Sequence, residues 1–145
     1  MKTNSTHTIR VLMQHALLPA QMAALRADFG PAYQVVGLPG ADLLAVPDEP
    51  SLGPGWFVSR ARLLLEGLGQ GDVVVLGGQA QLMAALAAGA HAMRVTPIEA
   101  VSRRQSTEAT GADGRVTKTS TFAFAGWRVV WAFTPADFGA VPTAN

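Results

Sequence analysis

The stretch Val73–Leu86, VVVLGGQAQLMAAL, decides the fold. Its four leading apolar residues are typical of a strand in the middle of a parallel sheet, where helices cover both faces. The glycine pair Gly77-Gly78 then opens an alanine-rich run that reads as a helix. In an α/β sheet, such a turn lies at the carboxyl end of a strand, where ligands bind. The stretch therefore predicts an α/β fold with a candidate ligand site at its turn.

Strands and helices alternate on both sides of this stretch, and proline or glycine marks the helix ends. The predicted strands are 8–14, 33–38, 72–77 and 92–98, and the predicted helices are 19–29, 56–68 and 79–89. The proline- and glycine-rich segment 39–55 is predicted as a loop with room for one helical turn at 42–45. The order βαβαβαβ indicates a doubly wound, mainly parallel central sheet with helices on both faces.

The pattern changes after Glu99. Residues 100–133 are rich in Thr, Val and Arg, alternate roughly between polar and apolar, and carry Asp113-Gly114 at their middle. This pattern predicts a C-terminal antiparallel β-hairpin attached to the core. We expect one domain over residues 1–145, with flexible termini at 1–7 and 135–145.

The composition excludes several classes of protein. Of 145 residues, 49% are hydrophobic and 14% charged, and the net charge is +1, which argues against disorder and against a bulk electrostatic grip on DNA. No apolar run approaches the ~20 residues of a membrane span. Cysteine is absent and the three histidines are scattered, so neither a metal site nor a cofactor is expected. A soluble cytoplasmic protein is the default expectation.

The turn after the central strand is the first candidate site. Glycines let a ligand approach the backbone closely, and the N–H groups of the first helical turn can bind an anion. Gln79 and Gln81 could add neutral donors. The alternative is a tight turn that needs its glycines for geometry alone, and both interpretations remain open.

His15 follows the first strand, at the same edge if that strand is parallel to the central one. Its imidazole could bind a phosphate or move a proton near neutral pH. The simpler interpretation is a loop histidine that caps the next helix.

Arg103 and Arg104 are the strongest cationic pair. Adjacent strand residues face opposite ways, so only one can address a given ligand unless a bulge intervenes. Aromatic residues on the return strand could stack on bases, but more often form core or a dimer interface. These aromatic residues are Phe122, Phe124, Trp127, Trp131 and Phe133.

Three segments taken together resemble a family of small stand-alone ring nucleases of type III CRISPR systems. Gln14–Gln21 (QHALLPAQ) is similar to that family's Asn-His-x-Leu-Thr-x-x-Gln motif, and 71–79 (GDVVVLGGQ) to its Gly-Asp…Val-x-Gly-x-x-Gly turn. Residues 100–108 (AVSRRQSTE), followed by Gly114-Arg115-Val116, resemble its Ala-Thr-Thr-x-Arg-x-x-x-Glu segment and Gly-basic-Val hairpin. The resemblance spans roughly residues 9–128.

The resemblance implies a CARF-like Rossmann domain that works as a homodimer on a cyclic oligoadenylate, most of all cyclic tetra-adenylate. In such enzymes a ribose 2′-hydroxyl of the substrate attacks the neighbouring phosphate, so no metal or protein nucleophile is required. The catalytic residues implied are His15, Ser102 and Arg104. The substrate-binding residues implied are Gln14, Gly77, Gly78, Gln79, Ala80, Gln81, Arg103 and Glu108.

Two alternatives stay open. Gln14, Val101 and Ser102 stand where the family motifs have asparagine and two threonines, so a protein that sequesters the messenger without cutting it is the second hypothesis. The third is an α/β dimer that interacts through its aromatic hairpin and binds no nucleotide.

Overall fold

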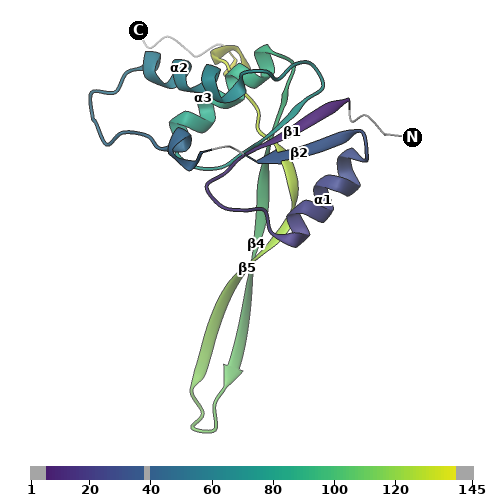
Figure 1. Ribbon diagram of the computed structural model, residues 1–145. Helices are drawn as coiled ribbons and strands as arrows, with labels where there is room; N and C mark the ends of the chain where they lie inside the picture. The colour runs from purple at the N-terminus through teal and green to yellow at the C-terminus, as the bar shows by residue number, and fades with distance from the viewer. Residues whose placement is uncertain (1–5, 38–39, 140–145) are drawn as a thin grey trace.

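A five-stranded β-sheet runs through residues 6–37 and 40–139, the part of the chain that the computed structural model describes (Figure 1). The elements in chain order are β1 (His7–Leu12), α1 (Pro19–Phe29), β2 (Tyr33–Gly37), η1 (Ala41–Leu44), α2 (Pro54–Leu65), β3 (Val73–Leu76), α3 (Ala80–Ala92), β4 (Thr96–Thr110), β5 (Val116–Val129) and η2 (Pro135–Phe138). The predicted α/β fold is confirmed.

The strand order is β2-β1-β3-β4-β5. The pairs β1-β2, β1-β3 and β3-β4 are parallel, and β4-β5 is antiparallel. The chain moves from β1 outward to β2 and then crosses to β3 on the other side of β1. The carboxyl ends of β1 and β3 therefore flank the point where the winding direction reverses, which is the usual ligand position in this architecture.

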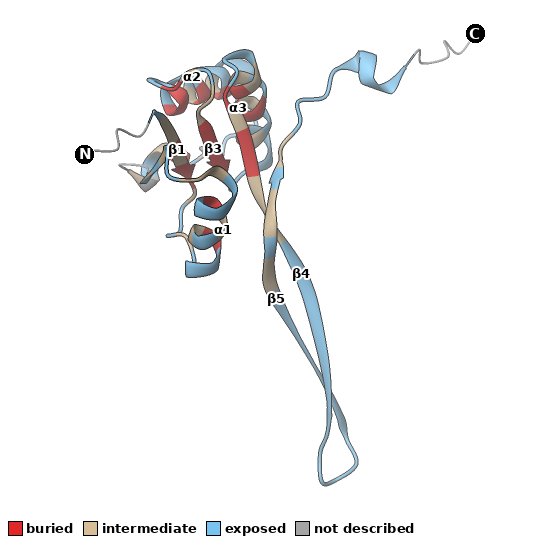
Figure 2. Ribbon diagram, turned by 90° about the vertical axis from the view of Figure 1, so that its right-hand side faces the viewer, coloured by how far each residue is buried: buried red, intermediate tan, exposed pale blue. Residues whose placement is uncertain are grey.

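Helices cover both faces of the sheet, as predicted, and the side chains of β3 alternate between them. Val73 and Val75 join a buried cluster with Leu25 of α1. Val74 and Leu76 face the other way, into a larger cluster formed with α2 and α3. All four β3 residues are at most 2% exposed, so the apolar run that predicted a central strand is the centre of both cores (Figure 2).

Several predicted boundaries were wrong. The first strand ends at Leu12 rather than Gln14, and the third helix ends at Ala92 rather than Gly89. No strand begins at residue 92, because α3 continues to Ala92 and Arg94 takes a left-handed conformation with φ 58°. The strand starts at Thr96 and continues without a break into the predicted hairpin, because β5 pairs with β4 beyond the point where β3 ends. The second helix ends at Leu65 rather than 68, since Gly67 has a positive φ of 83°.

The outer part of the hairpin, residues 102–124, is named the arm. It projects away from the rest of the fold, and every residue from Ser102 to Phe122 is exposed (Figure 2). Its turn is the predicted one: Gly114 has φ 79°, and the Asp113 carboxylate accepts a hydrogen bond from the Arg115 N–H at 3.1 Å.

The two ends expected to be flexible contain regular structure where they are described. His7 begins β1, and residues Pro135–Phe138 form a short 3-10 turn. The Thr134 N–H donates to the Asp137 carboxylate at 2.7 Å and caps this turn. The remaining residues of the predicted flexible ends, 1–5 and 140–145, lie outside the described residues.

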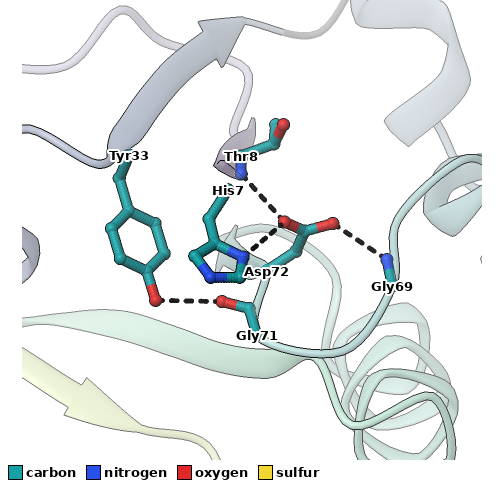
Figure 3. A network of polar contacts seen from close by, with 6 residues as sticks. All are labelled: His7, Thr8, Tyr33, Gly69, Gly71 and Asp72. Carbon is teal, nitrogen blue, oxygen red and sulfur yellow. Dashed lines mark hydrogen bonds and ion pairs between the residues drawn. The ribbon is translucent and has the colours of Figure 1, made fainter. Parts of the chain in front are cut away.

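A polar network closes the amino edge of the sheet around Asp72 (Figure 3). Its carboxylate accepts the Thr8 N–H at 2.8 Å and the Gly69 N–H at 2.9 Å, and lies 3.7 Å from the His7 ring. Gly71 has φ 89°, and a Cβ there would meet the His7 ring at 2.6 Å. The Gly-Asp pair before the central strand thus has a structural role, at the end of the sheet opposite the candidate site.

Arg10 ties β1 to the end of α2. Its Nη1 donates to the carbonyl oxygens of Leu64 at 2.9 Å and Glu66 at 2.7 Å, groups that the helix itself leaves without partners. We expect Arg10→Met to lower the free energy of unfolding by about 1–2 kcal/mol, since charged hydrogen bonds are lost while the apolar stem is kept. Urea denaturation followed by circular dichroism measures this. Arg62→Met, on the exposed side of α2, is the matched control, and an equal loss in both variants would contradict the assignment.

Candidate functional site

The carboxyl ends of β1 and β3 meet as the sequence predicted. Leu12 pairs with Leu76 in parallel register, so Met13 and Gly77 are neighbours. A Cβ on Gly77 would lie 3.1 Å from Met13 Cγ, and Gly78 has φ 124°, a conformation that favours glycine. Backbone geometry alone therefore explains why both positions are glycine, without reference to a ligand.

A pocket of about 460 Å³ opens where β1 leads into α1, and Val35 and Gly37 of β2 border it on the side away from β3. Gln14 and His15 are exposed at it, and its apolar lining includes Met13 and Leu17, which pack in the same cluster as α1. The pocket therefore lies on the α1 face of the sheet. An apolar lining with a few polar groups is typical of small-molecule sites.

The two glutamines of the turn line a different pocket. Gln79 and Gln81 border a space of about 290 Å³ together with Asp48 and Glu49, and its apolar lining packs with α2 and α3. The Gln79 side chain accepts a hydrogen bond from the Leu82 N–H at 2.9 Å and so caps α3, whose first residue is Ala80. The turn thus separates the glutamines from His15 instead of joining them in one pocket.

The remaining predicted site residues lie on the arm. Ser102, Arg104 and Glu108 alternate on one face, and Arg103 is on the other. The bulge in the pairing of β4 with β5 lies between Val101 and Ser102, where Ala125 of β5 is left over. It precedes both arginines and leaves them facing opposite ways.

The face that carries Arg104 is continuous with the α1 side of the sheet. Ile98 and Trp127 pack in the α1 cluster, and the Trp127 Nε1 donates to the Gln21 carbonyl of α1 at 3.3 Å. Phe124, opposite Ser102, meets Trp127 edge to face at 5.2 Å between ring centroids. By strand alternation Arg104 therefore belongs to the face that continues the His15 side of the sheet, and Arg103 to the opposite face.

Arg104 is nevertheless remote from that pocket within one chain. Glu99 is level with the ends of β1 and β3, and five further residues at ~3.4 Å each place Arg104 about 17 Å beyond that level. Its guanidinium donates to Ser120 Oγ at 2.9 and 3.1 Å, and Ser120 pairs with Ser106, nearer the tip. Glu108 forms an ion pair with Lys118 at 3.4 Å.

The aromatic residues divide into two groups. Trp127 and Phe124 pack at the base of the arm, whereas Phe122, Trp131 and Phe133 are 74%, 63% and 71% exposed. His91 supports the C-terminal segment: its Nε2 lies 2.8 Å from the Val130 carbonyl, and its ring stacks on Trp131. The first group is half-buried at the base of the arm, and the second is mostly exposed.

Sequence reasoning missed the apolar half of the pocket, which includes Met13, Leu17 and Met22. The signal was present: apolar residues continue past the end of a strand and into the first turn of the next helix. Among residues 6–37 and 40–139, no three histidine, aspartate or glutamate side chains form a group that could hold a metal ion, and no helix is long and apolar enough to cross a membrane.

Comparison with known proteins gives one family. The model of the family described as "Uncharacterized protein MJ1673 family" matches residues 7–128, from the start of β1 almost to the end of β5. No curated protein and no solved structure matches the chain.

Proposed function

The chain belongs to the uncharacterized protein MJ1673 family, and we propose that it is a metal-independent ring nuclease, which binds cyclic tetra-adenylate as a cytoplasmic homodimer and cleaves it. In this role it would switch off type III CRISPR signalling. The proposal combines the resemblance of three sequence segments to the ring-nuclease motifs with the site at the carboxyl edge of the sheet.

One observation carries the proposal. The pocket with Gln14 and His15 lies at the carboxyl edge of the sheet, beside the ends of β1 and β2, and on the face to which Ser102 and Arg104 belong by strand alternation. These side chains offer an amide, an imidazole, a hydroxyl and a guanidinium. Such groups position a phosphate and stabilise charge on it, which is what a substrate with its own nucleophile requires.

The reaction is an internal transesterification. The ribose 2′-oxygen forms a bond to the adjacent phosphorus and loses its proton, while the bond from phosphorus to the 5′-oxygen of the next nucleotide breaks. That 5′-oxygen takes up a proton, and the ring opens to a linear chain with a 2′,3′-cyclic phosphate. No water is consumed in this step.

Each residue has one task in this scheme. Arg104 stabilises the charge on the phosphate in the transition state. His15 donates to the leaving oxygen or orients the phosphate, and Ser102 hydrogen-bonds nearby. Gln14 and the backbone of Gly77 and Gly78 contact the ring, whereas Gln79 and Gln81 border the pocket on the other face of the sheet.

A second candidate function is sequestration of the same ligand without cleavage. It is favoured by the position of Arg104, which lies about 17 Å beyond the strand ends and is hydrogen-bonded to Ser120 in its own chain. A pocket without a nearby cation can bind and still fail to stabilise the transition state.

Incubation with labelled cyclic tetra-adenylate, with and without EDTA, separates the candidates. We expect retention of the ligand and linear products that EDTA does not affect. Retention without products would favour sequestration. No retention would contradict both, and would favour an interaction role for the exposed aromatic residues. Heat-unfolded protein is the control for background hydrolysis.

A further inference from the structure

The arm is a two-stranded ribbon with no covering layer in its own chain. Ribbons of two strands are marginal in water, and stability normally needs a third strand or a packed face. Here every residue from Ser102 to Phe122 is exposed, and Phe122, beside Arg104, is 74% exposed. A ribbon of this length is expected to pack against something outside its own chain.

The candidate site is also divided within one chain. His15 lies at the pocket where β1 ends, whereas Arg104 lies about 17 Å beyond the strand ends at ~3.4 Å per residue and points toward the arm tip. Both lie on the α1 side of the sheet. The His15 pocket and Arg104 therefore belong to the same face of the sheet but lie far apart along it.

We infer that the arm packs on a second copy of this chain and that Arg104 completes the His15 pocket of that copy. The inference rests on the proposed function for its ligand, but the arrangement of the chains can be measured without it. In a two-fold dimer, one patch meets the same patch, so each arm serves the other chain's pocket.

The register of the arm is compatible with such an axis. Suppose that the α1-side faces of two chains meet with their arms antiparallel. A two-fold axis level with Ser102 then brings a point about 17 Å beyond the strand ends of one chain close to the strand ends of the other. Ser102 is three residues past Glu99, or about 10 Å, close to the midpoint between Arg104 and the pocket. The remaining sideways offset from β4 to the ends of β1 and β2, which line the pocket, is two to three strand spacings, about 10–15 Å, which the ligand would bridge.

The area fits a dimer of two copies. From Ser102 to Thr110 the ribbon is about 30 Å long and ~10 Å wide, so one face offers about 300 Å². Each chain would cover one arm face and an equal area under the partner's arm, about 600 Å² per chain. Stable interfaces bury about 800 Å² per partner, so this contact supplies most of the required area.

Cross-linking tests the arrangement directly, because the chain contains no cysteine. A size-tagged His15→Cys chain is mixed with an Arg104→Cys chain and treated with a short bis-maleimide. We expect a covalent mixed dimer. Arg103→Cys, on the opposite face of the arm, is the matched partner that should give little of it. An equal yield from position 103, no mixed dimer, or a link only within the His15→Cys/Arg104→Cys double variant would overturn the inference.

Complementation tests the shared site. His15→Ala and Arg104→Ala chains are co-expressed with different tags, and the mixed dimer is isolated through both. Each mixed dimer then keeps one intact site of two, so we expect about half of the wild-type cleavage rate. A rate no higher than that of the single variants would overturn the arrangement in trans while leaving the proposed function standing. If wild-type protein does not cleave, the proposed function fails, and cross-linking alone decides the arrangement.

Discussion

Replacing Arg104 by alanine is expected to lower the rate of cyclic tetra-adenylate cleavage about 10²–10³-fold, the usual effect of removing one group that stabilises transition-state charge. The guanidinium lies on the α1 side of the arm, where it donates hydrogen bonds to the Ser120 hydroxyl. Single-turnover cleavage by excess enzyme measures the chemical step, and ligand retention reports binding separately.

The neighbouring arginine provides the control. Arg103 has the same charge and is also exposed, but it belongs to the opposite face, so Arg103→Ala should change the rate only a few-fold. Arg104→Lys keeps the charge but loses the two-pronged contact, and should recover part of the rate. The assignment is wrong if Arg104→Ala cleaves at the wild-type rate, or if both alanine variants fall equally.

Asp72→Ala should produce the largest loss of stability among the polar substitutions, about 2–6 kcal/mol in the free energy of unfolding. The carboxylate is 15% exposed and accepts the Thr8 and Gly69 N–H groups, which would lose their partner, and each such group costs about 1–3 kcal/mol. Urea denaturation followed by circular dichroism, with the slope checked for constancy, gives the value.

Two further variants serve as controls for that measurement. Asp72→Asn keeps one acceptor oxygen and should lose less, and Asp28→Ala, on the exposed side of α1, should lose little. Because the network lies at the amino edge, folded Asp72→Ala protein should retain its ligand as wild type does. A stability equal to that of Asp28→Ala would contradict the role given to the carboxylate.

Local sequence predicted the α/β core well because each signal there was strong and short-range. Val73–Leu76 is apolar on both faces, and the structure uses both, with Val73 and Val75 toward α1 and Val74 and Leu76 toward α2 and α3. Gly77-Gly78 marked the strand end, and Asp113-Gly114 marked the hairpin turn. In each case the backbone conformation itself limits the residues allowed.

Strand β4 was predicted less well, because its length depends on two partners. From Thr96 to Ile98 it pairs with β3, and from Ile98 to Thr110 with β5. No local sequence pattern shows that a single strand pairs with both β3 and β5. Tertiary structure also divides the candidate site. Gln14 and His15 lie at the carboxyl edge because they follow β1, as predicted, but they are on the opposite face of the sheet from Gln79 and Gln81.

The mass of the first product tests the central claim most directly. Attack by the substrate's own 2′-hydroxyl isomerises the ring, so opening it consumes no water. We therefore predict that wild-type protein, with cyclic tetra-adenylate and EDTA, first yields a linear product whose mass per adenylate equals that of the ring, as read by liquid chromatography and mass spectrometry. First products heavier by one water for each cut, or a ring left intact by folded protein, would contradict the account.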